Sequence, residues 1–348
     1  MKPNVLVVTT VHWPDDTRIR ERLIRTLARQ FEVQYASRAP GPTDRSDLGW
    51  LPLHGGRLLR NLRVLRLCLS ADFDLLVVPD PELLPTAMLT RLLRRRSVVF
   101  DVHENFPAVA MTRAWVPDVL RRPVSAMARF LLRLAERVLV ITLAEQGYSS
   151  LFRDEHTVFP NYPDTSRYPE PTSGDGSVVY LGDVTLERGA GVAVEAAAVH
   201  RRPMTIVGRV TDDLRAHLLE MAGEGVQVEF TGELPNPGAM ERIRTAGIAI
   251  APLLDSPNYR DSAPTKILEY LALGLPVVAS DLPGIRILVT GLEAVELVPP
   301  GDPGELARAI EDLLDPAVRQ TAAAQAPLVR QRYRWPGETV SRFYLSLV

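Results

Sequence analysis

The chain has 348 residues, 46% of them hydrophobic and 24% charged, which predicts about two globular domains and excludes a transmembrane protein, a coiled coil and a largely disordered chain. Its 40 basic and 42 acidic residues give a formal net charge of -2, so the average composition predicts no affinity for nucleic acid. The single cysteine, Cys68, excludes an intrachain disulfide framework and a cysteine zinc cluster, and it is typical of a protein in the reducing cytoplasm.

Short β-branched segments alternate with amphipathic ones along the chain, which is typical of parallel βαβ units. The first segment, Val5–Thr9, follows the N-terminus with no basic stretch ahead of it, so we expect no signal peptide. The other strands expected in the first half are Glu32–Ala36, Leu75–Val78, Ser97–Asp101, Val138–Ile141 and Thr157–Phe159. Those expected in the second half are Ser177–Leu181, Met204–Val207, Val226–Thr231, Ile248–Ala251, Pro276–Ala279 and Val295–Val298. The pattern predicts an α/β protein with two doubly wound parallel sheets.

A segment rich in proline and glycine, residues 160–176, separates the two sets of strands and predicts the domain boundary. Residues 1–165 carry 23 basic and 18 acidic side chains, a net charge of +5, whereas residues 166–348 carry 17 and 24, a net charge of -7. The near-neutral average therefore combines two halves of opposite charge.

One predicted helix, residues 57–69, concentrates the basic charge of the first half. Its arginines are Arg57, Arg60, Arg63 and Arg66, and its leucines at one-face spacing are Leu58, Leu62, Leu65 and Leu69. Two interpretations stay open. The leucines pack into the core beneath a solvated arginine face, or the helix binds an anionic membrane surface or an anionic substrate.

Polar and aromatic residues follow three strands of the first half, where ligands bind in doubly wound sheets. They are His12, Trp13, Asp16 and Arg18 after the first strand, Asp80 and Glu82 after the third, and His103, Glu104 and Asn105 after the fourth. Rings that stack and carboxylates that accept hydrogen bonds suit a sugar-like ligand. Asp80 and Glu82 have the spacing of a carboxylate pair for a divalent ion, but we favour an acceptor-binding or structural role for them, and Asp16 could instead cap the next helix.

The second half has two strand ends that suit a phosphate. Gly182 follows the first strand and Arg188 precedes the next helix, while Gly208 and Arg209 end the second strand. A glycine lets a ligand approach the backbone, and a cation with free amides at a helix start binds phosphate.

Lys266 is one of only two lysines in the chain, the other being Lys2. Ser262 and Pro264 predict a helix start, so Lys266 falls in the first turn, where a cation opposes the helix dipole unless an anion lies there. Glu269 lies on the same face of this helix, within reach of a ribose next to that anion. The alternative is an intrahelix ion pair between Lys266 and Glu269 with no ligand.

These motifs resemble those of the retaining glycosyltransferases of family 4, which have the GT-B fold. Asp261 and Glu269, embedded in Pro-Thr-Lys-Ile-Leu-Glu-Tyr-Leu, resemble the paired acids of that family, and the turn from Gly182 to Gly189 resembles its diphosphate turn. Asp16-Thr17-Arg18-Ile19 and Asp101-Val-His103-Glu104 resemble loops of one branch of it. The resemblance covers essentially the whole chain.

The resemblance implies two Rossmann-like domains facing a central cleft. Residues 1–165 would bind the acceptor and residues 166–330 the nucleotide sugar, with a last helix in residues 331–348 that crosses back to the first domain. It implies transfer of a hexose or N-acetylhexosamine, with retention and without a metal or cofactor, from a nucleoside-diphosphate sugar to a hydroxyl acceptor. A UDP-sugar is the favoured donor. The acceptor would be a glycan, a small molecule or a lipid-linked group. The lipid-linked acceptor and a peripheral membrane contact are hypotheses motivated by the net charge of +5 on residues 1–165 rather than by the resemblance.

The resemblance also implies roles for individual residues. The catalytic residues would be His103, Asp261, Arg188 and Lys266. Arg188 and Lys266 would also bind the donor, together with Gly182, Arg209, Glu233, Leu234, Ser262, Ala263, Thr265 and Glu269. The residues that bind the acceptor would be His12, Trp13, Asp16, Arg18, Asp80, Glu82, Glu104 and Asn105. The location expected for such chemistry is the cytoplasm, at the inner face of the membrane if the acceptor is a lipid.

Two positions depart from the common pattern of the family. Asp261 stands where a glutamate is usual, and Asp183 stands where an arginine often binds the diphosphate, for which Arg209 is our candidate replacement. Two other functions fit the same architecture: a sugar-nucleotide 2-epimerase, and a non-catalytic subunit that binds a nucleotide sugar.

Overall fold

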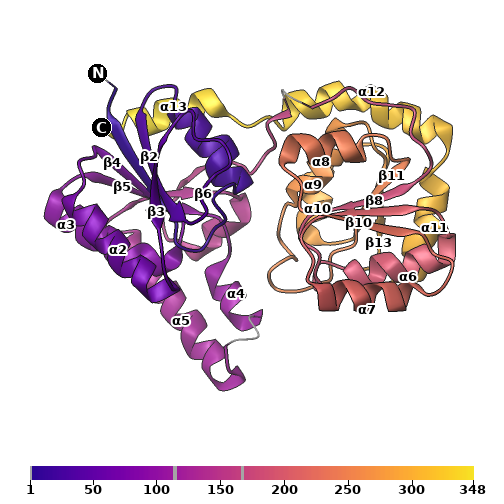
Figure 1. Ribbon diagram of the computed structural model, residues 1–348, viewed down its shortest axis with the longest axis horizontal. Helices are drawn as coiled ribbons and strands as arrows, with labels where there is room; N and C mark the ends of the chain where they lie inside the picture. The colour runs from indigo at the N-terminus through magenta and orange to yellow at the C-terminus, as the bar shows by residue number, and fades with distance from the viewer. Residues whose placement is uncertain (1, 113–115, 166–167) are drawn as a thin grey trace. The chain divides into compact units, whose positions relative to one another are not determined.

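The computed structural model describes residues 2–112, 116–165 and 168–348 (Figure 1). The chain forms two compact units, Met1–Asn161 with Trp335–Val348, and Tyr162–Arg334. From the sequence we expected the two domain boundaries after residues 165 and 330. In the structure the chain leaves the first unit after Asn161 and returns to it after Arg334.

The first unit is built on a parallel sheet of seven strands in the order β3-β2-β1-β4-β5-β6-β7. The strands are β1 (Asn4–Val8), β2 (Glu32–Arg38), β3 (Gly49–Leu53), β4 (Leu75–Val78), β5 (Ser97–Val102), β6 (Val140–Leu143) and β7 (Thr157–Val158). In register, Val5 of β1 lies between Val33 of β2 and Leu75 of β4. The central strands are buried on both faces, which is why they read as continuous apolar runs.

Helices cover both faces of this sheet. The elements α2 (Arg57–Ser70), α3 (Leu84–Arg94) and α5 (Asp118–Ala135) pack on one face, and η1 (Thr17–Ile24), α1 (Arg25–Leu27) and α13 (Gly337–Leu345) pack on the other. The short elements η2 (Pro81–Leu83), α4 (Phe106–Thr112) and η3 (Gln146–Leu151) connect them. Trp335, just before α13, donates a hydrogen bond from Nε1 to Oγ1 of Thr26 at 2.9 Å, which fixes the returning segment to the first unit.

The helix α2 does not bury the leucines that were expected to form a core stripe. Its buried residues are Val64 and Cys68, whereas Leu58 is 75% exposed and Leu62 is 56% exposed. The interpretation of a leucine core beneath solvated arginines is therefore wrong for α2, because leucines and arginines share its outer surface.

The second unit repeats the architecture with six parallel strands in the order β10-β9-β8-β11-β12-β13. The strands are β8 (Val178–Leu181), β9 (Met204–Val207), β10 (Val228–Gly232), β11 (Ile248–Ala251), β12 (Val277–Ser280) and β13 (Val295–Val298). One face carries α6 (Ala190–His200), α7 (Asp212–Ala222) and α11 (Pro303–Leu313); the other carries α8 (Asn236–Ile243), α9 (Thr265–Ala272), α10 (Pro283–Leu288) and α12 (Pro316–Arg332). The predicted pair of doubly wound parallel sheets is confirmed.

The strand order reverses direction between β1 and β4 in the first unit and between β8 and β11 in the second. At such a switch point the loops leave the two strands on opposite sides and open a crevice at their carboxyl ends, which is where ligands bind in these folds. None of the helices in the described part of the chain is long and apolar enough to span a bilayer.

Candidate functional site

The residues singled out by sequence gather at these two switch points, one in each unit. In the first unit they come from the ends of β1, β4 and β5. In the second unit they come from the ends of β8, β9, β10 and β11 and from the start of α9.

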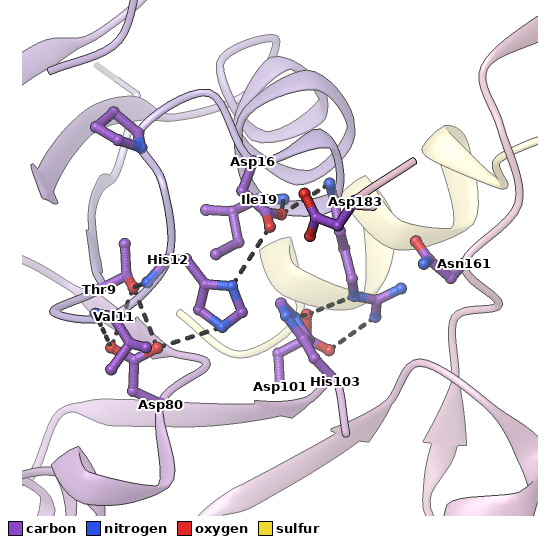
Figure 2. Close-up of polar contacts among 12 residues, drawn as sticks. Thr9, Val11, His12, Asp16, Ile19, Asp80, Asp101, His103, Asn161 and Asp183 are labelled. Atoms are coloured by element: carbon purple, nitrogen blue, oxygen red, sulfur yellow. Dashed lines mark hydrogen bonds and ion pairs between the residues drawn. The ribbon is translucent and has the colours of Figure 1, made fainter. Parts of the chain in front are cut away.

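Asp80 holds the loop that follows β1. Its buried carboxylate accepts hydrogen bonds from the hydroxyls of Thr9 and Thr10 and from the backbone N–H groups of Thr10, at 2.5 Å, and Val11, at 3.2 Å (Figure 2). A carboxylate that accepts several backbone N–H bonds fixes the chain around it. Asp80 therefore fixes the conformation of the loop that carries His12.

His12 lies between two carboxylates. Its Nδ1 is 3.3 Å from Oδ2 of Asp16, and its Nε2 is 3.5 Å from Oδ1 of Asp80 (Figure 2). Burial lowers the pKa of His12, but Asp16, Asp80 and Glu104 outweigh it and raise that pKa to about 9. His12 is therefore an imidazolium at neutral pH. Asp16 also caps η1 by accepting from the N–H groups of Arg18 and Ile19, both at 3.0 Å.

Arg18, Asp101 and His103 form a buried chain of charge beside His12. Arg18 donates from Nε and Nη2 to the two oxygens of Asp101 at 3.1 and 2.9 Å, and from Nη1 to the carbonyl of Phe159 at 2.9 Å. Oδ2 of Asp101 lies 2.7 Å from Nε2 of His103. Burial raises the pKa of Asp101, but Arg18 and His103 overcome this and hold it well below its usual range.

His103 stays neutral at physiological pH. Burial lowers its pKa, and Arg18 and His12 add to that effect, while Asp101 opposes it. The ring centroids of His103 and His12 are 5.4 Å apart in an edge-on arrangement. The site thus pairs a cationic and a neutral imidazole, with Asp101 orienting the neutral one. The side chain of Arg18 is 5% exposed, and its Nε, Nη1 and Nη2 all donate to Asp101 or to a backbone carbonyl, so Arg18 is placed to orient Asp101.

The other residues expected to bind the acceptor lie around this pair. Trp13 is 46% exposed and stacks against the guanidinium of Arg38, 3.2 Å from the ring centroid. Glu82 accepts from the hydroxyl of Thr10 and pairs with an arginine of α2. Asn105 caps α4 by accepting from the N–H of Ala108 at 3.1 Å, and Glu104 precedes it.

The second unit buries the ammonium group of a lysine in α9. Lys266, in the first turn of α9, is 8% exposed, and its Nζ finds no acceptor among the described residues. Nζ lies 4.3 Å from the ring centroid of Tyr180. Burial, and then the charge of Arg188, lower the pKa of Lys266 to about 7, against the opposing effects of Glu269 and Asp183.

Arg188 and Lys266 converge on one point of backbone, at Gly182. A Cβ atom placed on Gly182 would lie 3.7 Å from Nζ of Lys266 and 3.8 Å from Nη1 of Arg188. Gly182 has a φ of 118°, which a residue with a side chain rarely adopts. Two cations brought together over an open glycine, with one of them unpaired, form the geometry of an anion site.

Glu269 is one turn further along α9 and does not pair with Lys266. Its Oε1 accepts hydrogen bonds from the hydroxyl of Tyr168 at 3.0 Å and from Nδ2 of Asn236 at 3.1 Å. No ion pair joins these two described side chains, so the alternative of an intrahelix pair is not what the structure forms. Glu269 is 6% exposed, and its Oε2 has no partner among the described residues.

The carboxylate of Asp183 pairs with the guanidinium of Arg209. Nε and Nη2 of Arg209 both donate to Oδ1 of Asp183, at 3.0 and 2.9 Å, and Oε2 of Glu233 lies 3.6 Å from the same Nε. Arg209 therefore offsets the acid that stands in place of the family's arginine. Leu234 packs against the core next to Glu233.

The segment before α9 forms a turn. Both the N–H and the hydroxyl of Ser262 donate to the carbonyl of Tyr259 at 3.2 Å, so the amide expected to face the donor sugar is used within the turn. Asp261 is exposed, while Ala263 and Thr265 are half-buried. α9 begins at Thr265 without a side-chain cap.

Two other glycines show how tightly the backbone packs here. A Cβ on Gly208 would lie 1.9 Å from the carbonyl oxygen of Gly182, and one on Gly189 would lie 1.7 Å from that of Pro252. Both glycines have positive φ. No larger residue fits without moving the turn that carries Arg188.

Sequence reasoning missed several residues that build the second cluster. Tyr270 accepts the N–H of Leu181 at 2.7 Å and thereby ties α9 to β8. Tyr259 accepts from Nε of Arg188 at 3.2 Å. Tyr168 and Asn236 reach Glu269 from segments outside any motif, so no local sequence signal pointed to them. In the described part of the chain, no group of three histidine, cysteine or acidic residues has the geometry of a metal site.

Comparison with known families agrees with this geometry. Residues 175–316, which include the whole second cluster apart from Tyr168, match the family Glycosyl transferases group 1. The phosphatidyl-myo-inositol mannosyltransferase of Mycolicibacterium smegmatis is 26% identical over 281 residues, which are 76% of this chain and 69% of that protein. A D-inositol 3-phosphate glycosyltransferase of Acidothermus cellulolyticus is 31% identical over 177 residues, 46% of this chain and 38% of that protein.

Solved structures share the fold across both units. Sucrose-phosphate synthase from Thermosynechococcus elongatus superposes with a TM-score of 0.78 at 17% identity, covering 99% of this chain and 98% of that one. Anabaena HepE, solved in complex with UDP and glucose, gives a TM-score of 0.76 at 17% identity with the same coverage. The chain therefore has the GT-B fold, and residues 175–316, within its second unit, match the group 1 glycosyltransferases.

Proposed function

We propose that this protein transfers a hexose or N-acetylhexosamine, with retention of configuration, from a nucleoside-diphosphate sugar to a hydroxyl acceptor. The observation that carries the proposal is the buried ammonium of Lys266, which has no hydrogen-bond partner among the described residues and lies beside Arg188 over Gly182. An unpaired buried charge is costly, and a bound diphosphate removes that cost by supplying the missing counter-charge. A UDP-sugar is the favoured donor, in keeping with the UDP bound to Anabaena HepE.

Residues of the second unit would bind each part of the donor: the diphosphate, the ribose, the sugar and the base. Arg188 and Lys266 contact the diphosphate, and the free Oε2 of Glu269 accepts hydrogen bonds from the ribose hydroxyls. Asp261 and the backbone of Ala263 contact the sugar, and the backbone near Glu233 and Leu234 faces the base. Arg209 adds positive electrostatic potential at the edge of the diphosphate site, and its ion pair with Asp183 reduces that potential.

The chemistry follows from where charge develops. As the bond between the anomeric carbon and the diphosphate breaks, negative charge grows on the leaving oxygens. Arg188 and Lys266 are already positioned there, so they stabilise the transition state without reorganisation. We propose that these two side chains supply the positive charge without a metal, and that the departing diphosphate takes the proton of the acceptor hydroxyl.

The first unit would receive the acceptor at the histidine pair. Neutral His103, oriented by Asp101, donates or accepts a hydrogen bond near the reacting centre, and cationic His12 favours an acceptor that carries negative charge. Trp13 offers an exposed ring for stacking against a sugar. We keep the cytoplasm as the proposed location, in accord with the single, buried and reduced Cys68.

Thermal shift measurements with a panel of nucleoside diphosphates test the donor site. A ligand that binds only the folded state raises the melting temperature, and we expect UDP to give the largest increase. Lys266→Met should abolish the increase, while Lys2→Met, at the exposed lysine, should leave it intact. The absence of a response to every nucleotide would overturn the proposal.

Product analysis separates transfer from epimerisation. With a donor sugar and an acceptor, the proposal predicts free nucleoside diphosphate and a glycosylated product in equal amounts, and Glu269→Ala should remove both. An interconverted nucleotide sugar formed without acceptor would identify a 2-epimerase and contradict the proposal. If Asp261→Ala and Glu269→Ala leave the biological activity intact, the chain is a binding subunit instead.

A further inference from the structure

The helix α5 carries large apolar side chains on the surface of the first unit. Val119, Leu120, Val124, Met127, Phe130 and Leu134 are all more than one third exposed, and Val119 reaches 82%. Val119 and Leu120 are adjacent and the others follow at intervals of three to four residues, which places all six along one broad stripe of the helix. The buried residues of α5, Leu132 and Ala135, face the sheet on a different side.

Arginines gather beside this stripe in a pocket of about 620 Å³. Arg122, Arg129, Arg133, Arg137 and Arg153 line it together with apolar atoms of Phe130 and Leu134. No acidic side chain is among the described residues of its wall. The pocket thus offers positive charge next to an apolar surface.

The charge in this pocket is poorly neutralised by the protein itself. Arg122, Arg129 and Arg137 have no ion pair or side-chain hydrogen bond to any described residue. Arg133 approaches Glu136 at 3.8 Å, but that carboxylate already accepts the backbone N–H of Arg153 at 2.7 Å. Nη1 of Arg133 is buried and has no hydrogen-bond partner among the described residues.

The neighbouring helices continue the same surface. α2 and α3 pack against one another, α3 packs against α5, and all three cover one face of the sheet (Figure 1). Leu58 and Leu62 of α2 and Leu92 and Leu93 of α3 are exposed. Neither α2 nor α3 contains an acidic residue, so arginine and leucine dominate the outer layer.

We propose that this surface, defined as the stripe of α5 with its arginine pocket and called here the α5 face, docks on an anionic lipid bilayer. The stripe enters the boundary between headgroups and acyl chains, and the pocket arginines hold lipid phosphates. A soluble phosphate would neutralise the arginines but leave the apolar stripe in water. A polynucleotide would likewise leave most of the stripe in water, because Phe130 is the one ring among its six apolar side chains and the other five offer no stacking surface.

The inference goes beyond the proposed sugar transfer and does not depend on it, because every residue of the α5 face lies outside the donor and histidine clusters. It relocates the membrane contact expected from the arginines of residues 57–69 to α5, where a pocket accompanies the exposed apolar stripe. Docking would bring the first unit to acceptors carried by the bilayer.

Co-sedimentation of the full chain with lipid vesicles tests the inference. The chain should sediment with vesicles of phosphatidylcholine and phosphatidylglycerol, and much less with vesicles of phosphatidylcholine alone. Replacing Arg122, Arg129 and Arg137 together by Gln should lower the partition coefficient about 100-fold, or roughly fivefold for each arginine. Met127→Ser combined with Phe130→Ser should lower it about tenfold, because apolar area no longer enters the bilayer.

A matched control takes an exposed apolar residue and an exposed arginine from the second unit. Ile287→Ser combined with Arg201→Gln should leave the partition coefficient unchanged. All variants should keep the thermal response to UDP, which shows that they are folded. Equal binding to both kinds of vesicle, or variants of the α5 face that sediment like the wild type, would overturn the inference. Loss of UDP binding with intact vesicle binding would instead reject the proposed function alone.

Discussion

Replacing Lys266 by Met should stabilise the ligand-free protein and abolish its response to UDP. The ammonium is buried with no acceptor in the part of the chain that the structure describes, and its pKa falls from an ordinary 10.5 to about 7. The unfolded chain therefore binds a proton more tightly than the folded chain. At 1.36 kcal/mol for each pKa unit, this lysine costs the fold on the order of 4 kcal/mol at pH 7.

Methionine is similar in volume to lysine and carries no charge, so it should recover about half of this cost. A gain of about 2 kcal/mol corresponds to a rise in melting temperature of roughly 4–8 °C for a unit of this size. The sign follows from linkage: the folded-state pKa is depressed, so the penalty is largest below pH 7 and fades as the pH rises to 10.5. The advantage of the Lys266→Met variant should fade over the same range.

Differential scanning calorimetry across this pH range, with and without UDP, provides the measurement. The wild type should gain about 2.7 kcal/mol of stability at a UDP concentration of 100 times Kd, and the Lys266→Met variant should gain almost none. Lys2→Met is the control, because Lys2 is exposed and its Nζ contacts only the carbonyl of Ala28. A Lys266→Met variant that melts below the wild type and still responds to UDP would refute the reasoning.

Three further predictions concern the other charged groups. Glu269→Gln should weaken UDP binding about tenfold while leaving the affinity for inorganic diphosphate unchanged, because Oε2 is the atom that we propose for the ribose, whereas Oε1 is held by Tyr168 and Asn236. Calorimetric titration with both ligands checks this, and an equal loss for both would contradict it. Asp101→Asn should lower the free energy of unfolding by about 3–5 kcal/mol, because it leaves the buried guanidinium of Arg18 without a counter-charge. Asp118→Asn, at the surface, is the control and should change the free energy of unfolding by less than about 0.5 kcal/mol; urea unfolding of both variants measures the difference. The ion pairs of His12 raise its pKa from 6.5 to about 9, so their contribution to the free energy of unfolding is complete below pH 6.5 and is lost as the pH rises through 9. The free energy of unfolding of the His12→Gln variant should lack this loss. The same pH dependence in the wild type and in the variant would exclude the pairing.

The sheets of both units were predictable because each central strand is a short β-branched run buried on both faces. The strand at Gly49–Leu53 was missed, because a glycine and a proline interrupt the pattern, and Pro52 is tolerated only because β3 lies at the edge of its sheet. The sequence also left undecided whether Leu58 and Leu62 are buried, and the structure exposes both. Periodicity shows which residues share a face of a helix, but it does not show whether that face meets the sheet.

The chemical groups of the site were predictable in kind but not in partnership. The position of Lys266 in a first helical turn followed from Ser262 and Pro264, whereas its lack of any acceptor depends on how α9 packs against β8. Arg18 was grouped with residues that face a ligand, yet the fold buries it against Asp101 and a carbonyl of the chain near β7. Such contacts join residues far apart in sequence, so no local pattern encodes them.

The most direct test of the central claim is the titration of Lys266 itself. Because Lys266 and Lys2 are the only lysines, NMR of protein labelled at lysine resolves both side chains without further engineering. The account predicts that Lys266 titrates near pH 7 in the free protein, and that UDP moves its pKa upward because the diphosphate stabilises the ammonium. A Lys266 signal that titrates near 10.5 in the free protein, or that UDP leaves unmoved, would contradict the account.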